Sequence, residues 1–271
     1  MWRRMPVLMT VLIFGYAFLY GPILSLMVYS FNENRLVTVW SGFSTKWYGE
    51  LLQNEQILDA AWLSVKIASV NASLAVILGT LAALALVRFK RFRGRSVMQT
   101  MVTAPLVMPE VIIGLSLLLL FVAMQKTLGW PEGRGQLTIT IAHVTFSLAY
   151  VTVVVQSRLF HMDQSLEEAA LDLGAKPLKV FFAITLPLIA PALLAGWLLA
   201  FTLSMDDLVV ASFVSGPGAT TLPMVVYSSV RLGVSPQINA LATIIVLVVS
   251  MAVLIAGIVM YRKEKRASRL S

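Results

Sequence analysis

The chain has 271 residues, of which 58% are hydrophobic and only 13% are charged. This composition excludes an ordinary soluble domain and predicts a polytopic membrane protein. There is no cysteine, which excludes disulfides and thiolate metal sites. The net charge of +8 does not indicate nucleic-acid binding, because the basic residues stand in short clusters at the ends of apolar runs.

Six apolar segments are long enough to cross a membrane, since a helical crossing needs about 20 apolar residues. They predict an all-α fold with six transmembrane helices in a single domain over residues 1–271. The first segment is expected to be an uncleaved span, because a signal peptide has a shorter apolar core and a small-residue cleavage site. The expected spans are about 6–31, 60–87, 97–124, 137–158, 188–214 and 239–261.

The distribution of lysine and arginine orients these spans. An even number of spans puts both termini on one side, and the positive-inside rule selects that side. One set of segments carries fifteen basic residues: Arg3, Arg4, Arg88, Lys90, Arg91, Arg93, Arg95, Arg158, Lys176, Lys179, Arg262, Lys263, Lys265, Arg266 and Arg269. The other set carries five: Arg35, Lys46, Lys126, Arg134 and Arg231. The asymmetry predicts cytoplasmic termini, with the basic cluster at 262–266 acting as a stop-transfer anchor at the lipid surface.

Residues 159–187 form a polar segment between the fourth and fifth spans. Ser165 is expected to cap a short helix, with Glu168 completing a capping box. Gly174 suits the left-handed position that ends such a helix. Pro177 fits the first turn of a second helix, and Pro187 is expected to mark a turn into the fifth span. The segment is therefore predicted to be a helix–turn–helix outside the membrane.

Three acidic residues, Glu110, Asp206 and Asp207, lie within predicted spans, where charges are costly and by default mark a pathway. Two prolines precede Glu110, so its helix is expected to be kinked there, with carbonyl groups freed. At about 1.5 Å per residue, Glu110 lies roughly 20 Å from the cytoplasmic end and Asp206 roughly 28 Å. Two acidic depths on one route suit a cation. Alternatively, each carboxylate pairs with a neighbouring helix or with Lys66, or lies at the outer interface.

Asp206 and Asp207 cannot face a pathway equally, because neighbours on a helix point about 100° apart. We expect one to meet the substrate and the other to be tied to backbone or to a neighbouring helix. Trp197 and Phe201 share this helix and are candidates to line the pathway, since aromatic faces attract ammonium groups. Asp206 is the favoured pathway residue, because Trp197, nine residues earlier, is placed on about the same helical side.

The polar segment carries a motif of fixed spacing from Glu168 to Pro187. It reads Glu-Ala-Ala, three residues, Gly, nine residues, Ile, one residue and Leu-Pro. This pattern resembles the coupling loop of permease subunits of bacterial ABC importers, whose first helix docks on the ATP-hydrolysing subunit. The resemblance implies that the coupling residues are Glu168, Ala169, Ala170, Gly174, Ile184, Leu186 and Pro187.

The resemblance covers nearly the whole chain and extends to a family of polyamine permeases, the second permease subunits of spermidine/putrescine importers. It is carried by the segments 29–32, 45–48, 104–110, 203–207 and 215–218. It implies putrescine or spermidine as substrate and a bacterial inner-membrane location. The implied partners are a second permease chain, two ATPase subunits that bind the ATP and Mg²⁺, and a periplasmic substrate-binding protein. No cofactor is implied for this chain itself.

A loop rich in turn residues is predicted on the external side. A plain hairpin explains much of residues 215–223, but Gly216, Pro217 and Gly218 also resemble the outer gate loop that meets the binding protein in these permeases.

Other functional classes remain open at this stage. A permease for another solute would share much of the same pattern. An ion-coupled secondary transporter could also use carboxylates in its spans, but it usually shows internal repeats, and none is visible here. An enzyme would need a nucleophile, a base or a metal set, and no such motif is found. His143 and His161 lack metal-ligand spacing and are interpreted as structural.

Overall fold

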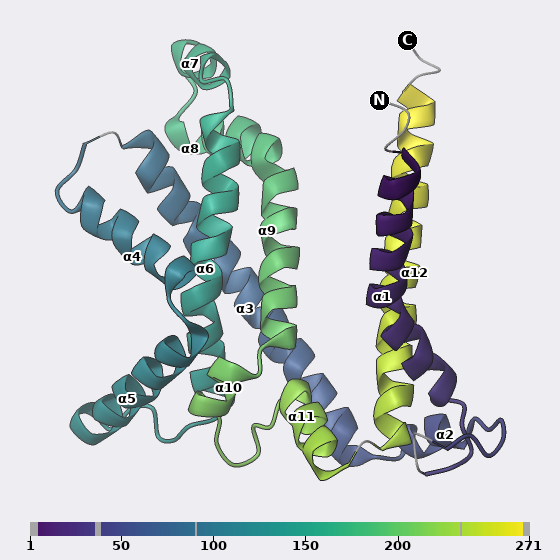
Figure 1. Ribbon diagram of the computed structural model, residues 1–271. Coiled ribbons are helices and arrows are strands. Elements are labelled where there is room, and N and C mark those ends of the chain that lie inside the picture. The colour runs from purple at the N-terminus through teal and green to yellow at the C-terminus, as the bar shows by residue number, and fades with distance from the viewer. Residues whose placement is uncertain (1–4, 36–38, 90, 234, 268–271) are drawn as a thin grey trace. The chain divides into compact units, whose positions relative to one another are not determined.

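The computed structural model describes residues 5–35, 39–89, 91–233 and 235–267, and within them the regular structure is helical. Arg3, Arg4, Lys90 and Arg269, which entered the charge count, lie outside the described residues. The helices follow one another along the chain (Figure 1). They are α1 (Met5–Tyr29), α2 (Lys46–Leu52), α3 (Glu55–Arg88), α4 (Arg95–Val107), α5 (Glu110–Leu128), α6 (Gln136–Phe160), α7 (Ser165–Asp172), α8 (Pro177–Val180), the π-helical η2 (Phe181–Thr185), α9 (Leu186–Asp206), α10 (Val209–Val214), α11 (Leu222–Leu232) and α12 (Pro236–Ala267).

Five of the described helices are long and apolar enough to cross a membrane. They are Val7–Tyr29, Glu55–Arg88, Glu110–Leu128, Gln136–Phe160 and Pro177–Asp206. The apolar stretch Pro236–Met251 opens α12, where the sixth span is expected. The all-α membrane fold is therefore confirmed. The chain divides into two compact units, residues 1–58 with 226–271 and residues 59–225, and the expectation of a single permease domain stays a prediction.

The first unit combines α1, α2 and α12. The turn after α1 is built around Asn32, which is fully buried and donates its side-chain N–H to the carbonyl of Val39 (2.7 Å). The indole of Trp47 on α2 donates to the Asn32 carbonyl (2.6 Å). Gln237 at the start of α12 bonds Asn54 and Glu50. These polar contacts tie the start of α12 to the segment around α2.

The second unit is built around α6, which packs along α9 (Figure 1). Fully buried Val151 and Val155 of α6 form one apolar core with alanines of α3 and with Ile189 of α9. Glycines allow the helices to approach: a Cβ on Gly79 of α3 would lie 2.9 Å from Val151. Van der Waals packing between close backbones is what holds helices together in lipid, where tails are as apolar as leucine.

The helix expected over 97–124 is broken rather than only kinked. It ends as α4 at Val107 and resumes as α5 at Glu110. Met108, the residue before Pro109, has extended backbone (ψ 136°), because a following proline disfavours the α conformation. Glu110 consequently lies in the first turn of a new helix, where a negative charge is favoured by the helix dipole.

The helix expected over 188–214 is also two helices. α9 ends at Asp206, Asp207 is extended (ψ 119°), and the short α10 follows from Val209. α10 packs against α5 and α6, and a Cβ on Gly114 of α5 would meet Phe213 of α10 at 2.7 Å. The prediction of one continuous helix was wrong, because periodicity alone did not reveal that Asp207 would cap a new helix instead of continuing the old one.

Pro187 does not mark a turn. Residues 177–206 run on as one helical rod of 30 residues. The π-helical turn just before Pro187 explains how: Leu186 donates to the Phe181 carbonyl five residues earlier, a wider turn that accommodates a proline ring. The second helix of the predicted helix–turn–helix is therefore the beginning of the fifth span, and α7 is the separate helix.

α7 ends as predicted but begins differently. Gly174 has a φ of +84°, and the N–H groups of Gly174 and Ala175 donate to the carbonyls of Leu171 and Ala170, which is a Schellman motif. Ser165 is the first helical residue rather than the cap, so the capping box with Glu168 is absent. Instead the Asp163 carboxylate accepts the Ser165 backbone N–H (2.9 Å), and this hydrogen bond lowers the pKa of Asp163.

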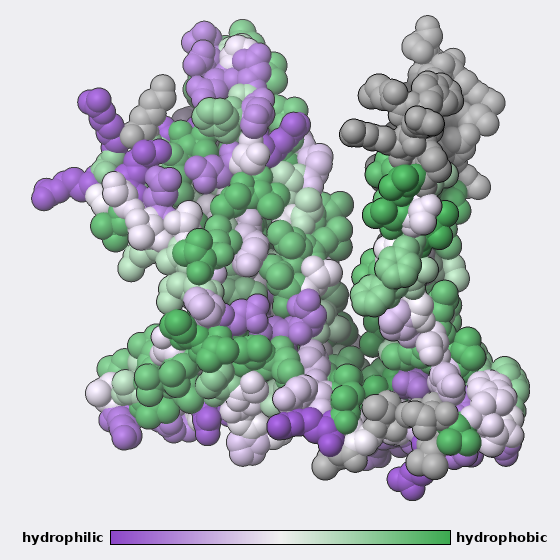
Figure 2. All heavy atoms as spheres, in the orientation of Figure 1, coloured by the Kyte–Doolittle hydropathy of each residue, from purple (hydrophilic) through white to green (hydrophobic). Residues whose placement is uncertain are grey.

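The surface of the second unit separates by polarity (Figure 2). Hydrophilic side chains gather around α7, whereas apolar side chains predominate on the visible faces of α5, α6 and α9. This distribution fits a helical body in lipid with α7 in water.

The close approach of α3 and α6 gives a packing prediction. Gly79→Val should destabilise the protein by about 1–3 kcal/mol, because the added atoms overlap Val151 and neither helix can move freely. Gly15→Val in α1 is the matched control, since a Cβ there meets nothing within 4 Å. Both changes bring the same small gain in helix propensity, because valine is a better helix former than glycine. The thermal unfolding midpoint in detergent measures the difference, and equal midpoints would contradict close packing at Gly79.

Candidate functional site

The three acidic residues that the sequence placed within spans line one pocket of about 340 Å³. The pocket forms where both helix breaks of the second unit meet, between the ends of α4 and α9 and the starts of α5 and α10. Its lining consists of Pro105, Leu106, Met108, Glu110, Ile113, Phe146, Tyr150, Leu203, Asp206, Asp207, Leu208, Val209 and Val210. Glu110 and Asp206 thus line the same pocket, and their expected depths in the membrane stay a prediction.

Glu110 and Asp206 are the available carboxylates of this pocket. Both residues are exposed, and neither makes an ion pair within the part of the chain that the structure describes. Lys66, considered above as a partner, instead contacts Gln136 (3.5 Å). Both carboxylates are therefore free to bind a ligand.

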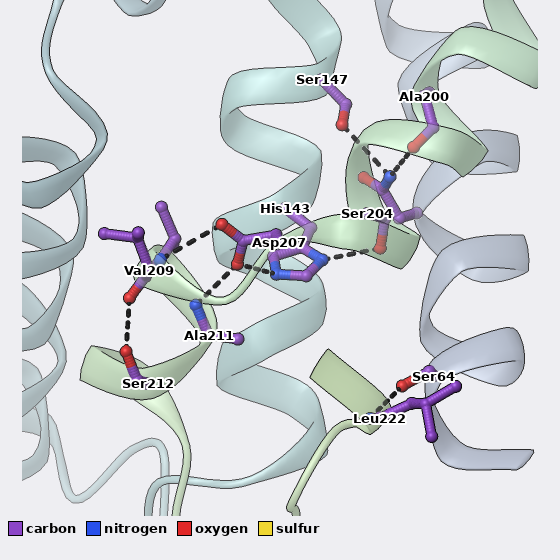
Figure 3. A network of polar contacts seen from close by, with 12 residues as sticks. Ser64, His143, Ser147, Ala200, Ser204, Asp207, Val209, Ala211, Ser212 and Leu222 are labelled. Carbon is purple, nitrogen blue, oxygen red and sulfur yellow. Dashed lines mark hydrogen bonds and ion pairs between the residues drawn. The ribbon is translucent and has the colours of Figure 1, made fainter. Parts of the chain in front are cut away.

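Asp207 is tied down, as expected for one member of the aspartate pair. It is 8% exposed, and its carboxylate accepts N–H groups from Val210 (3.2 Å) and Ala211 (2.7 Å) in the first turn of α10. A third contact joins Asp207 Oδ2 to His143 Nε2 at 3.0 Å (Figure 3). Asp207 thus caps α10 and fixes the break that exposes Asp206.

His143 contacts Asp207, a link that the sequence did not predict. It is fully buried on α6, and its second ring nitrogen, Nδ1, contacts the Ser204 hydroxyl at 2.7 Å (Figure 3). The interpretation as a structural histidine missed its link to the acidic pair, because its partners are 61 and 64 residues away in sequence. The chain Ser204–His143–Asp207 has the residue types of a hydrolytic triad. Ser204, however, is buried at 5% exposure and does not line the pocket.

Trp197 and Phe201 do not line the pocket with Asp206. Their rings stack on each other (centroids 5.2 Å apart) and pack against the core shared with α3, and the Trp197 indole donates to Ser73 (3.2 Å). The helical argument that put Trp197 beside Asp206 was wrong. Nine residues make two and a half turns of 3.6 residues, which places the two side chains on opposite faces. The geometry still favours Asp206 as the pocket residue, for the different reason that Asp207 is occupied.

Two other aromatic residues line the pocket. Phe146 and Tyr150 stand one turn apart on α6, on the same side as His143. Residues four apart on a helix are neighbours, so both rings border the pocket from the same side of α6. The i, i+3, i+7 spacing of His143, Phe146 and Tyr150 indicates that they share one face of α6. That this face borders the acidic residues follows only from the contact between His143 and Asp207.

The backbone adds to the negative character of this pocket. Asp206 stands at the carboxyl end of α9, where the last carbonyl groups lack intrahelical donors and the helix dipole is negative. A carboxylate at this end is unfavourable by itself, and a cation there is favourable. Two free carboxylates, a helix carboxyl end and two aromatic side chains are features that favour the binding of an organic cation.

The coupling-motif residues lie on α7 and on the rod that follows it. Glu168 and Ala169 are exposed on α7, whereas Ile184, Leu186 and Pro187 belong to the helical rod 177–206. α7 is held by a residue that the motif does not include. Glu167 pairs with Arg88 at the end of α3 (2.7 Å) and accepts a hydrogen bond from Thr185 (2.6 Å).

The loop after α10 contains the glycines predicted for the outer gate. A Cβ on Gly216 would overlap the backbone of Arg134, so this loop lies against the loop before α6. Gly218 has a φ of +73° and open space around it, so its requirement is conformational. Thr138 of α6 donates to the Val214 carbonyl (2.7 Å) and fixes the start of the loop.

This helical architecture matches a known class of transport proteins. Residues 75–269 match the family model described as "Binding-protein-dependent transport system inner membrane component". The chain therefore belongs to this family of membrane subunits of transport systems.

Individual relatives agree with this assignment. The chain is 61% identical over 266 residues to the putrescine transport system permease protein PotI of Escherichia coli (strain K12), covering 98% of this chain and 95% of PotI. It is 44% identical to the spermidine/putrescine transport system permease protein PotC of the same strain, covering 93% of each chain. Among solved structures, a chain of a bacterial ABC transporter for import of the acidic polysaccharide alginate has the same fold. Its TM-score is 0.70 at 18% identity, with 95% of this chain and 96% of that chain covered.

The unequal environments of the aspartates predict unequal mutant phenotypes. Asp206→Asn should lower transport while assembly and binding-protein affinity stay unchanged, because a free ligand-facing charge is lost. Asp207→Asn should destabilise the protein, since hydrogen bonds to a charged group contribute about 1.5–3 kcal/mol each. Transport rate and thermal stability, measured on both variants, test the division. Wild-type transport by both would mean that this pair does not line the pathway.

Proposed function

We propose that this chain is the membrane-spanning permease subunit of an ATP-driven importer that translocates a polyamine, with putrescine favoured over spermidine. The observation that carries the proposal is the pocket with two free carboxylates, Glu110 and Asp206, beside the carboxyl end of α9. The 61% identity to the putrescine permease PotI supports the choice of substrate.

The pocket replaces the hydration that the ammonium groups of a polyamine lose when they enter it. An ammonium group that leaves water suffers a large desolvation cost unless it is paired. The two carboxylates offset that cost for two ammonium groups, and the faces of Phe146 and Tyr150 accommodate the methylene spacer between them. An anionic solute would be repelled by the same groups.

The remaining machinery is proposed to lie on partner chains. We infer a second permease subunit, two ATPase subunits that bind ATP and Mg²⁺, and a periplasmic binding protein. A solved relative with the same fold, an alginate transporter, was crystallised in complex with its periplasmic protein, which supports the last of these. α7, with its exposed Glu168 and Ala169, is proposed to dock on the ATPase.

The proposed location is the bacterial inner membrane with both termini in the cytoplasm. The family description supports the membrane, and the excess of basic residues on one set of segments supports the orientation. This orientation places α7 on the side where ATP is available.

Uptake by the reconstituted complex tests the substrate and the energy source together. Proteoliposomes that contain all subunits should accumulate di- and triamines when ATP and the binding protein are supplied, and should not accumulate amino acids or anions. Accumulation of a different solute instead would show that the chain belongs to an importer for that solute and not for polyamines. Accumulation that follows an ion gradient without ATP would favour the secondary transporter.

The positive φ of Gly174 predicts the effect of a coupling variant. Gly174→Val should uncouple or release the ATPase while the chain still inserts into the membrane, because a β-branched residue is strained at a φ of +84°. Gly174→Asn is the matched control, since asparagine tolerates this conformation. Co-purification of the ATPase and uptake measure the outcome. Normal uptake by the valine variant with the ATPase bound would contradict a coupling role.

The gate loop, on the proposed external side, gives a prediction that is independent of the coupling helix α7. Replacing Gly216 and Gly218 together by Val should weaken stimulation of ATP hydrolysis by the loaded binding protein, because one change blocks close packing and the other strains the turn. Basal hydrolysis should change less. Gly133→Val in the neighbouring loop is the control, since a Cβ there meets nothing within 4 Å. An equal loss of basal and stimulated hydrolysis would argue against this assignment.

A further inference from the structure

The pocket is lined by three carboxylates, of which two are exposed and the third, Asp207, is buried and accepts three hydrogen bonds. Glu110 and Asp206 are exposed and without ion pairs among the described residues, whereas Asp207 is held by Val210, Ala211 and His143. The two backbone donors belong to the turn that Asp207 caps. His143 is the side-chain donor, and it reaches Asp207 from a different helix.

We propose that His143 is a specificity-determining positioning residue that withholds Asp207 from the substrate. With Asp207 occupied, this chain offers two ligating carboxylates, which match the two ammonium groups of a diamine. With Asp207 released, a third carboxylate would favour a triamine. The inference deepens the proposed function and rests on it, since it requires that the pocket bind the polyamine.

The hydrogen-bond pattern assigns the roles of both ring nitrogens. The Asp207 carboxylate can only accept, so His143 Nε2 donates to it over 3.0 Å. The Ser204 hydroxyl can then donate to Nδ1 over 2.7 Å, so both ring nitrogens have a polar partner. The imidazole is fully buried, with the Phe146 ring 5.5 Å from it between centroids. Packing and both hydrogen bonds therefore fix the ring.

His143 competes with the substrate for Asp207. Asp207 borders the pocket, so a ligand ammonium and the imidazole N–H compete for its oxygen Oδ2. Removing the imidazole leaves the two α10 donors in place, and the break after α9 keeps its cap. The other titratable groups that border the pocket are Glu110, Asp206 and Tyr150, and none of them carries a positive charge.

Transport of a diamine and a triamine by the full reconstituted complex tests the proposal. His143→Leu should raise the ratio of spermidine to putrescine transport about tenfold, which corresponds to ~1.4 kcal/mol. His143→Gln should keep a ratio near that of the wild type, because its amide N–H can reach the position of Nε2. The binding protein is identical in all assays, so a changed ratio arises in the permease.

A double variant separates release of Asp207 from a general packing defect. In an Asp207→Asn background there is no carboxylate to release, so adding His143→Leu should leave the ratio unchanged. Equal loss of both amines in the assembled His143→Leu complex, or an unchanged ratio, would overturn the proposal. If the leucine variant does not assemble, His143→Asn replaces it: its shorter amide should raise the ratio while His143→Gln does not, and equal ratios would overturn the proposal.

This failure is distinguishable from failure of the proposed function. If the pocket does not bind polyamine at all, Asp206→Asn transports both amines at the wild-type rate. If only the role of His143 is wrong, Asp206→Asn still impairs transport while the ratio does not respond to His143.

Discussion

The hydrogen bonds that Asp207 accepts are the interactions on which the pocket depends. A helix that breaks within a membrane leaves backbone groups without partners, and each such group costs several kcal/mol in hydrocarbon. Asp207 satisfies the first turn of α10, and His143 satisfies Asp207 from α6. The break after Asp206 is stable for this reason, and Asp206 can therefore face the pocket at the carboxyl end of α9.

A second break supplies the opposite wall of the same pocket. Pro109 forces Met108 out of helical conformation, and α5 begins at Glu110. The two breaks differ in their causes, since one arises from proline and the other from a capping carboxylate. Their common result is that carboxylates from distant parts of the chain meet where backbone carbonyls are also available. Such a combination suits a cation with more than one charge.

The same helix that ends at the pocket begins beside α7. Residues 177–206 form one rod, which at about 1.5 Å per residue spans roughly 45 Å. Glu167 ties α7 to Arg88 of α3 and to Thr185 within the π-helical turn of this rod. A displacement of α7 would thus act on the same continuous helix that bears Asp206 at its other end. This connection offers a physical route from the proposed ATPase partner to the proposed substrate pocket.

The sequence by itself determined the membrane class, the apolar helices, the Schellman turn at Gly174 and the three acidic residues that line the pocket. These features follow from local chemistry. Long apolar runs are stable in lipid, a left-handed turn favours glycine, and a charged residue within a span is costly unless it has a partner or a function. Only the tertiary structure decided that α9 ends at Asp206, that Trp197 faces the core, and that Phe146, Tyr150 and His143 belong to the site. Periodicity reports which residues share a helix face, but not where a helix stops when its cap is satisfied by a side chain 64 residues away. That long-range contact could not be read from local spacing, because the partner that stabilises the break is brought to it only by the packing of α6 against α9 and α10.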